Sequence, residues 1–287
     1  MMQQTNFSFE VVIHDDASTD GTQDIIREYQ EKHPGVFFPL FQQENQYSKG
    51  VRSMMAKYNF PRSRGKYIAL CEGDDYWTDP NKLQKQVDFL ESNPEVVLTG
   101  HDALIINQKG ELVSRSKLPQ EKKRDCSSIE LQKCFYVLTQ SMCFRNVPLL
   151  KNMPEESFTS KMGDVFLISI LGQFGSYKYI SDIQPTAYRI HENGIWGMKK
   201  EEERTLMMRS AFTQLSKYYG RVSNRRMELY HTQMVLQTSQ QLLKRQLQAS
   251  TSMLAKMAAC FQFITQHYFF KKPVIVSKLY YISFFKK

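Results

Sequence analysis

Several features that would place this 287-residue chain in a familiar class are missing from it. Its five cysteines form no CxxC pair, and their odd number argues against a disulfide framework or a zinc ribbon. There is no run of about 18 apolar residues and no basic-then-apolar signal pattern, so we expect a protein of the reduced cytoplasm without a spanning helix. The composition, 41% hydrophobic and 13% aromatic, still supports a folded core.

Acidic residues are scarce in the C-terminal part. Residues 1–196 carry 22 Lys and Arg against 25 Asp and Glu, whereas residues 197–287 carry 16 against 4, a net charge of +12. No acid follows Glu228. This asymmetry indicates a polyanionic partner, either nucleic acid or an anionic membrane surface. The change in composition predicts a domain at 1–198 and a helical, basic C-terminal extension at 199–287.

In the first hundred residues, strands that end in acids alternate with helices. Segments 9–14 and 67–71 are short apolar runs followed by Asp-Asp and Glu-Gly-Asp-Asp. Further strands are expected at 36–42 and 96–106, with extended chain at 177–190. Helices are expected at 20–33, 50–58, 80–90 and 162–174, and a helical region from about 201 to 267. This order predicts an α/β fold with a mostly parallel sheet flanked by helices, followed by the helical extension.

The first acidic strand end reads HDDASTDGT at 14–22. Open α/β sheets bind ligands at the carboxyl edge of their strands, where a carboxylate can accept a nucleobase N–H or a ribose hydroxyl. The candidate binding residues are Asp15, Asp16, Ser18 and Asp20. The alternative is that they only form the turn and cap the following helix.

The second acidic strand end reads EGDDYW at 72–77. Clustered carboxylates repel one another, and a hard divalent cation, Mg²⁺ or Mn²⁺, would offset that repulsion while bridging to substrate phosphates. The alternative is an acidic loop that is simply solvated.

Together, these two segments resemble the inverting family 2 glycosyltransferases of the GT-A fold. The stretch EGDDYWTDPNKLQKQVDFL is similar to a subgroup among bacterial surface-polysaccharide enzymes, and the resemblance continues at MGDVFL (162–167) and YRIHENGIW (188–196). It covers about residues 5–197. It implies that a nucleoside-diphosphate sugar is bound through Asp15, Asp16, Ser18 and Asp20, with Arg189 and His191 facing the diphosphate. It also implies that Asp74, with Glu72 and Asp75 close by, binds Mn²⁺ or Mg²⁺, and that Asp164 is the general base.

The chain departs from the family pattern at its start. Members begin with a strand rich in Val and Ile, a Thr/Ser-Tyr-Asn turn and a helix, and Met1 falls where that helix should end. The resemblance therefore predicts that roughly thirty residues of the pattern are absent. It also predicts that the chain alone is poorly active.

The leading hypothesis is an inverting glycosyltransferase that uses a glycan or lipid-linked acceptor in cell-surface polysaccharide biosynthesis. The alternative is a non-catalytic remnant that acts as a membrane-surface or complex-forming protein. Aromatic residues and lysines gather after residue 267, which favours binding at the inner face of the cell membrane over packing against the body or a partner subunit. Nucleic acid is disfavoured as a partner, because no recognisable module is present.

Overall fold

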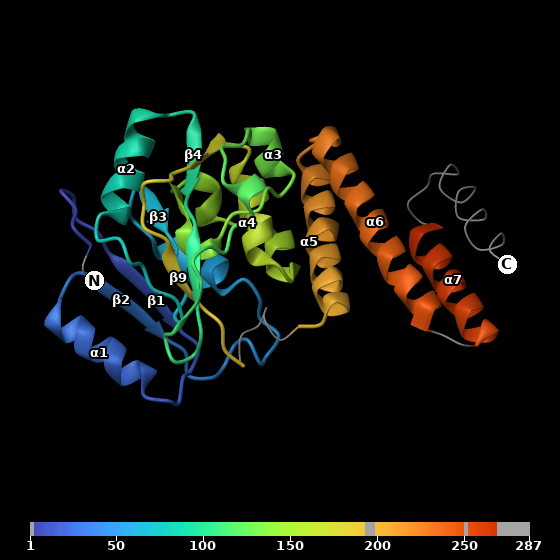
Figure 1. Ribbon diagram of the computed structural model, residues 1–287, viewed down its shortest axis with the longest axis horizontal. Coiled ribbons are helices and arrows are strands. Elements are labelled where there is room, and N and C mark those ends of the chain that lie inside the picture. Colours follow the sequence, from blue (N-terminus) through green and yellow to red (C-terminus); the bar gives the residue numbers. More distant parts are fainter. Residues whose placement is uncertain (1–2, 193–198, 250–251, 269–287) are drawn as a thin grey trace.

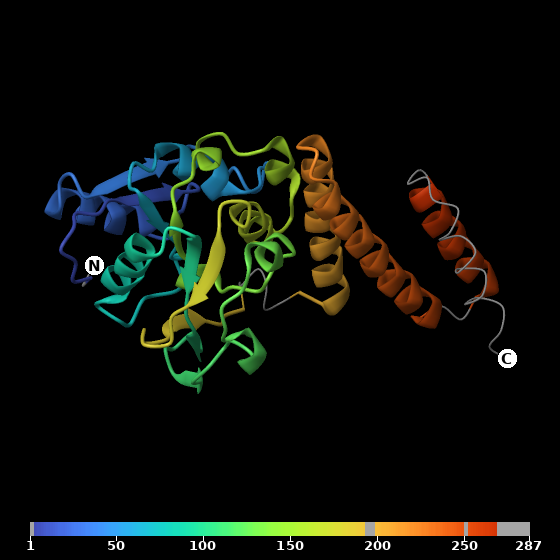
Figure 2. The same cartoon turned by 90° about the horizontal axis from the view of Figure 1, so that it is seen from above.

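The computed structural model describes residues 3–192, 199–249 and 252–268. These form an α/β body built on three small sheets, with long helices attached at one side (Figures 1 and 2). The strands are β1 (Val11–Asp15), β2 (Phe37–Phe41), β3 (Tyr67–Ala69), β4 (Val96–Gly100), β5 (Ala103–Ile106), β6 (Leu112–Ser114), β7 (Cys143–Arg145), β8 (Ser176–Tyr179) and β9 (Thr186–Arg189). The α-helices are α1 (Thr22–Lys32), α2 (Lys82–Ser92), α3 (Ser128–Gln132), α4 (Gly163–Leu171), α5 (Glu201–Arg221), α6 (Arg225–Ala249) and α7 (Met253–Tyr268).

Strands β1 and β2 form a two-stranded parallel sheet with α1 as the connection between them. Gly21, at φ 86°, precedes α1 in a left-handed conformation that glycine adopts at little cost. The predicted strands and helix are confirmed here, with ends that differ from the predicted ones by one or two residues. Helix α1 covers this sheet loosely, because its Ile25 side chain remains 59% exposed.

The central sheet has the order β3-β7-β4-β8 and carries the main core. All five residues of β4 are buried, and helix α4 packs its Leu167, Ile168 and Leu171 into the same cluster. Strand β7 runs antiparallel to both of its neighbours, whereas β4 and β8 are parallel. The sheets are therefore mixed and not mostly parallel, since the 131–145 segment returns as a strand of opposite direction.

The third sheet has the order β6-β5-β9, and it shows that the single strand expected over 96–106 is wrong. The chain leaves the central sheet at His101 and Asp102. Asp102 Oδ1 accepts the Ala103 N–H at 2.8 Å, and the His101 ring is 2.8 Å from the Asp102 carbonyl. These local hydrogen bonds compete with the sheet ladder, so the run continues as β5 in a different sheet.

The described residues of the C-terminal region form the helices α5, α6 and α7, as the helical pattern from about 201 to 267 predicted. Asn224 caps α6 by accepting the Met227 N–H at 3.2 Å, directly after Ser223 at φ 59°. Helix α5 shares a buried cluster with α4, in which Leu215 and Tyr219 meet Phe166. Helix α7 lies beyond α6, away from the body (Figures 1 and 2). None of the helices in the described ranges combines the length and apolar character that a membrane crossing requires.

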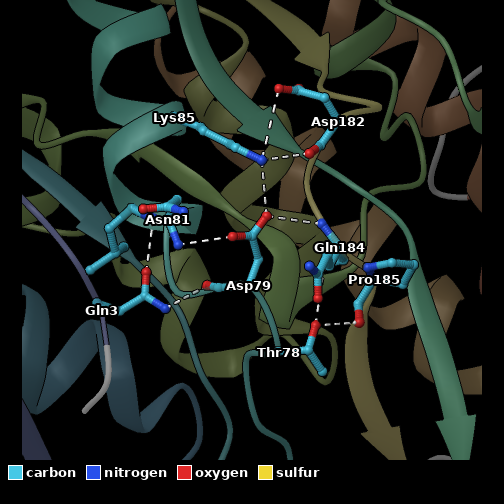
Figure 3. Close-up of polar contacts among 9 residues, drawn as sticks. Gln3, Thr78, Asp79, Asn81, Lys85, Asp182, Gln184 and Pro185 are labelled. Carbon is cyan, nitrogen blue, oxygen red and sulfur yellow. Dashed lines mark hydrogen bonds and ion pairs between the residues drawn. The ribbon is translucent and has the colours of Figure 1, made fainter.

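A buried carboxylate, Asp79, fastens the loop that follows the second acidic strand end (Figure 3). It accepts the Asn81 N–H at 2.8 Å and the Gln184 N–H at 3.1 Å, and it pairs with the Lys85 ammonium at 3.0 Å. Because Gln184 belongs to the β8–β9 connection, this network ties the start of α2 to the strand that leads into the 188–192 segment. The two segments expected to build the diphosphate site are thereby held together.

Candidate active site

At the first acidic strand end, Asp15 and Asp20 are satisfied by local partners. Asp15 Oδ1 accepts the Ser18 N–H at 3.1 Å and the Gln23 amide at 2.6 Å. Burial favours the neutral acid, but these hydrogen bonds outweigh it and lower the pKa of Asp15. Asp20 accepts both the hydroxyl and the N–H of Thr22, at 2.6 and 3.1 Å, which lowers its pKa as well. Both carboxylates serve the turn that leads into α1.

Asp16 holds a neighbouring loop. Its two carboxylate oxygens accept the backbone N–H groups of Gln46 and Tyr47, at 2.7 and 2.9 Å, while its carbonyl accepts the Asn45 amide at 3.0 Å. These contacts support the turn interpretation for Asp15 and Asp20, whereas Asp16 holds the 45–47 loop, and the N-cap position of α1 is Gly21, which has no side chain to cap the helix. The role of Asp15, Asp16, Ser18 and Asp20 in binding a nucleotide stays a prediction.

The second acidic strand end is different, because in the described part of the chain one of its buried carboxylate oxygens has no hydrogen-bond partner. Asp75 is 8% exposed; its Oδ1 accepts the Arg189 N–H at 2.9 Å, but its buried Oδ2 has no hydrogen-bond partner in the described part of the chain. Burial raises the pKa of Asp75 to about 6. Glu72 is an exposed residue, but the protein around its carboxylate group partly desolvates it. This desolvation, reinforced by the charges of Asp75, Asp74 and Asp164, raises the pKa of Glu72 to about 7.

His191 and Arg189 both reach this turn. The His191 Nε2 lies 3.0 Å from Asp74 Oδ2, so two predicted site residues from distant parts of the sequence are brought into contact. The Arg189 guanidinium donates to the backbone carbonyls of Asp74, Asn107 and Gln108 at 3.1 to 3.3 Å. Arg189 therefore braces the acidic turn from β9.

Asp164 stands in the first turn of α4, where the helix N-terminus favours a negative charge. Burial nevertheless raises its pKa above the usual value. Its charge is one of those that raise the pKa of Glu72, which places Asp164 within electrostatic reach of the acidic turn. That Asp164 acts as the base beside these acids stays a prediction.

Whether these acids fit a divalent cation can be judged from their oxygens. Carboxylates are the donors that Mg²⁺ and Mn²⁺ prefer, and the unpartnered Oδ2 of Asp75 is suited to a cation. However, within the described residues no three such side chains converge closely enough to hold a metal by themselves. The donor set fits a cation whose coordination is completed by water and, once the substrate is bound, by its phosphate.

Lys117 is the site residue that the sequence did not reveal. It lies in the 107–130 segment, and its pKa is lowered to about 8 by burial, against the opposing influence of Asp75 and Glu72. Its ammonium lies 3.1 Å from the centroid of the Tyr188 ring on β9. Only the buried Leu118 beside it hinted that this polar stretch returns to the protein.

Comparison with known proteins gives matches over much of this body. Residues 1–148 match the model of glycosyl transferase family 2. The chain is 36% identical over 194 residues to the uncharacterized protein Rv1520 of Mycobacterium tuberculosis. The aligned region covers 68% of this chain and 54% of that protein. It is 33% identical over 94 residues to the Escherichia coli UDP-Glc:alpha-D-GlcNAc-diphosphoundecaprenol beta-1,3-glucosyltransferase WfaP, covering 32% of this chain and 33% of that one. The chain spans about half the length of the first of these relatives.

A solved structure supports the same fold. Staphylococcus aureus TarS 1–349, crystallised with UDP-GlcNAc, superimposes with a TM-score of 0.54 over 91% of this chain and 74% of that chain, at 16% sequence identity. At this identity the likeness concerns the fold. It extends beyond residue 148, where the family match ends, because it covers 91% of this chain.

Proposed function

This chain belongs to glycosyl transferase family 2 and has the GT-A fold, and on that premise we propose that it moves a sugar from a nucleoside-diphosphate sugar to a hydroxyl acceptor with inversion. The observation that carries the proposal is the 3.0 Å contact between His191 and Asp74, which joins two distant segments of the motif on which the family resemblance rests. In this proposal Asp164, in the first turn of α4, supplies the acid that can take a proton, and the acids of the turn can hold a diphosphate through a cation.

In the proposed reaction Asp164 takes the proton of the acceptor hydroxyl while the acceptor oxygen attacks the anomeric carbon. The bond from that carbon to the diphosphate breaks, and its electron pair leaves with the diphosphate. A raised pKa suits Asp164 to this task, because a stronger base removes the proton more readily at neutral pH. Asp74, Glu72 and Asp75 would hold a divalent cation, which when bound neutralises charge on the leaving diphosphate.

The acceptor that we propose is a glycan or lipid-linked sugar of a bacterial surface polysaccharide. WfaP, by its name, transfers glucose from UDP-Glc to a diphosphoundecaprenol-linked sugar, and its match with this chain supports that substrate class. A lipid-linked acceptor requires the enzyme to work at the membrane.

Helix α7 has an apolar side that the rest of the described chain leaves uncovered. Met257 and Phe261, one turn apart, are 61% and 69% exposed, and Lys256 lies next to them. No acidic residue follows Glu228. We infer that this surface rests on an anionic membrane, with the rings and thioether at headgroup depth and the basic residues on phosphates. The lysines and aromatic residues of 269–287 on which the sequence-based expectation relied lie outside the described residues.

Donor-binding calorimetry tests the catalytic proposal. Titrations with UDP-glucose, UDP-GlcNAc and GDP-mannose, each in Mn²⁺ and in EDTA, should reveal one donor that binds more tightly with the metal. Asp74→Asn should abolish that gain, whereas Asp24→Asn, an exposed acid in the first turn of α1, should leave it intact. A folded wild-type chain that binds none of a wider panel would favour the alternative of a non-catalytic remnant.

Cosedimentation with vesicles tests the membrane proposal. The wild type should sediment with phosphatidylglycerol vesicles more than with phosphatidylcholine vesicles. The double variant Met257→Gln, Phe261→Gln should lose several-fold of that binding, while Leu229→Gln, an exposed apolar residue of α6, serves as the matched control. Equal sedimentation of both variants, or no preference for the anionic lipid, contradicts the assignment of α7.

A further inference from the structure

The backbone of Lys117 is fixed firmly to the body. Its N–H donates to the Ala103 carbonyl at 2.7 Å and to Asp102 Oδ1 at 3.2 Å, and the next residue, Leu118, donates to the same oxygen at 2.9 Å. Leu118 is 4% exposed and anchors the segment in a small apolar cluster. The position of the Lys117 side chain is therefore set by the fold and not by a free loop.

This side chain leads toward the acidic turn. Its ammonium lies over the Tyr188 ring, 3.1 Å from the ring centroid, and the residue after Tyr188 donates its N–H to Asp75. An ammonium over an aromatic face is attracted by the ring but keeps its donors for other partners. The arrangement presents a positive charge beside the second acidic strand end.

The ammonium has no carboxylate partner there. The acid that fixes its backbone, Asp102, is paired instead with Lys123 at 2.8 Å. The negative charges of Asp75 and Glu72 oppose the lowering of the pKa of Lys117 by burial. In the described chain, however, neither carboxylate lies within 4.0 Å of the Lys117 nitrogen. An unpaired ammonium and the unpaired, buried Oδ2 of Asp75 thus share one site without neutralising each other.

A ligand that carries both signs would satisfy both groups, and a phosphate accompanied by a cation is such a ligand. We propose that Lys117 contacts the diphosphate of the donor and holds it partly without metal, so that the site has a built-in positive charge beside its cation-binding acids. The inference rests on the proposed function, because it takes the ligand to be a nucleoside diphosphate. Lys117 then adds to the charge that stabilises the departing diphosphate.

Removing the charge should change two affinities in opposite directions. Lys117→Met should weaken UDP binding in EDTA by about tenfold, which corresponds to one lost hydrogen bond to a charged group. The same change should strengthen Mn²⁺ binding measured in the absence of nucleotide, because a positive charge near Glu72 and Asp75 is gone. A residue that only supports the fold would weaken both affinities and lower the melting temperature.

The experiment is isothermal titration of the full chain with UDP, first in EDTA and then with MnCl₂, followed by titration with MnCl₂ alone. GDP and ADP replace UDP if the donor panel selects another base. Lys117→Arg should keep UDP affinity in EDTA within a few-fold, and Lys109→Met, which removes an exposed lysine from the β5–β6 turn, should bind as the wild type does. Thermal melts confirm that each variant is folded.

The outcomes separate this inference from the function on which it rests. If the wild type binds no nucleoside diphosphate in any condition, the proposed function fails and the inference with it. If the wild type binds and Lys117→Met binds equally well in EDTA, only the role of Lys117 is overturned. The role of Lys117 is also overturned if Lys117→Met lowers the affinity for Mn²⁺ together with the affinity for UDP.

Discussion

The two acidic strand ends of this protein look alike in sequence but differ in their chemistry. After β1, the carboxylates of Asp15, Asp16 and Asp20 each accept two hydrogen bonds, mostly from neighbouring backbone. After β3, Asp75 retains a buried oxygen without a partner, and the pKa of Glu72 is raised to about 7. Hydrogen bonds therefore lower the pKa of Asp15 and Asp20 and stabilise their charged forms, whereas burial raises the pKa of Asp75 and Glu72 and disfavours their charged forms, a cost that a ligand would relieve.

This difference shows what distinguishes an acidic turn that shapes the chain from one that binds a ligand. Hydrogen-bond donors that surround a carboxylate in the folded chain make it part of the fold and remove the free energy cost of leaving it unpaired. Where burial and neighbouring acids disfavour the charge more than hydrogen-bond donors stabilise it, the free energy cost of the charged carboxylate remains in the ligand-free protein. Strained electrostatics of this kind concentrate at functional sites, and here they occur beside the contact between His191 and Asp74.

Of the changes proposed for the second acidic strand end and the residues around it, Asp164→Asn is expected to have the largest effect on activity. The substitution preserves size and most hydrogen bonding but removes basicity, so sugar transfer should fall by about 10²–10⁴ while donor affinity is nearly kept. Transfer is measured with a radiolabelled donor and a lipid-linked acceptor, and donor affinity by calorimetry.

The matched control for this variant is Asp24→Asn at the first region, which is expected to transfer at the wild-type rate. A transfer rate that Asp164→Asn leaves intact would remove this residue from the chemical step. A loss of donor affinity equal to the loss of rate would instead assign it to binding.

Much of the local structure could be predicted because its causes are local. The runs before Asp15 and Glu72 are β-branched or apolar and form strands, and the turns that follow contain the small and polar residues that such turns need. The motif resemblance also pointed to Asp74 and His191, which the structure brings to 3.0 Å. The family assignment that this resemblance implied is confirmed.

What could not be predicted depends on contacts between distant segments. The split of 96–106 requires the competition of Asp102 for backbone donors, and the antiparallel β7 follows from where the chain returns after α3. Lys117 is an ordinary lysine in a polar stretch until Tyr188 is placed beneath it. No periodicity within one sequence encodes such a pairing, because neither residue is near the other along the chain.

A second experiment compares the stability that the two regions contribute. Asp16→Ala removes acceptors from two backbone N–H groups, so the free energy of unfolding should fall by about 1.5–3 kcal/mol. Asp74→Ala removes an exposed carboxylate whose contact is His191, and the change should stay within about 0.5 kcal/mol. Urea unfolding followed by circular dichroism measures both. Equal losses from the two variants would show that the regions do not differ in the way described above.

The smallest effect, and the sharpest contrast in sign, is expected in the pH dependence of stability. Glu72 has a pKa raised to about 7 from its usual 4.5, so the folded protein binds this proton more tightly than the unfolded chain does. Its contribution to stability is complete below about pH 4.5 and is lost as the pH rises through 7. Asp15 has a lowered pKa, so its contribution is present above its usual value of 3.8 and is lost as the pH falls.

In EDTA, Glu72→Gln should therefore flatten the decline in the free energy of unfolding between pH 5 and 7, whereas Asp15→Asn should alter that free energy only at acid pH. Urea midpoints from pH 3 to 8 give both slopes, and a Glu72→Gln variant with the wild-type slope would refute the assignment of the raised pKa to this carboxylate.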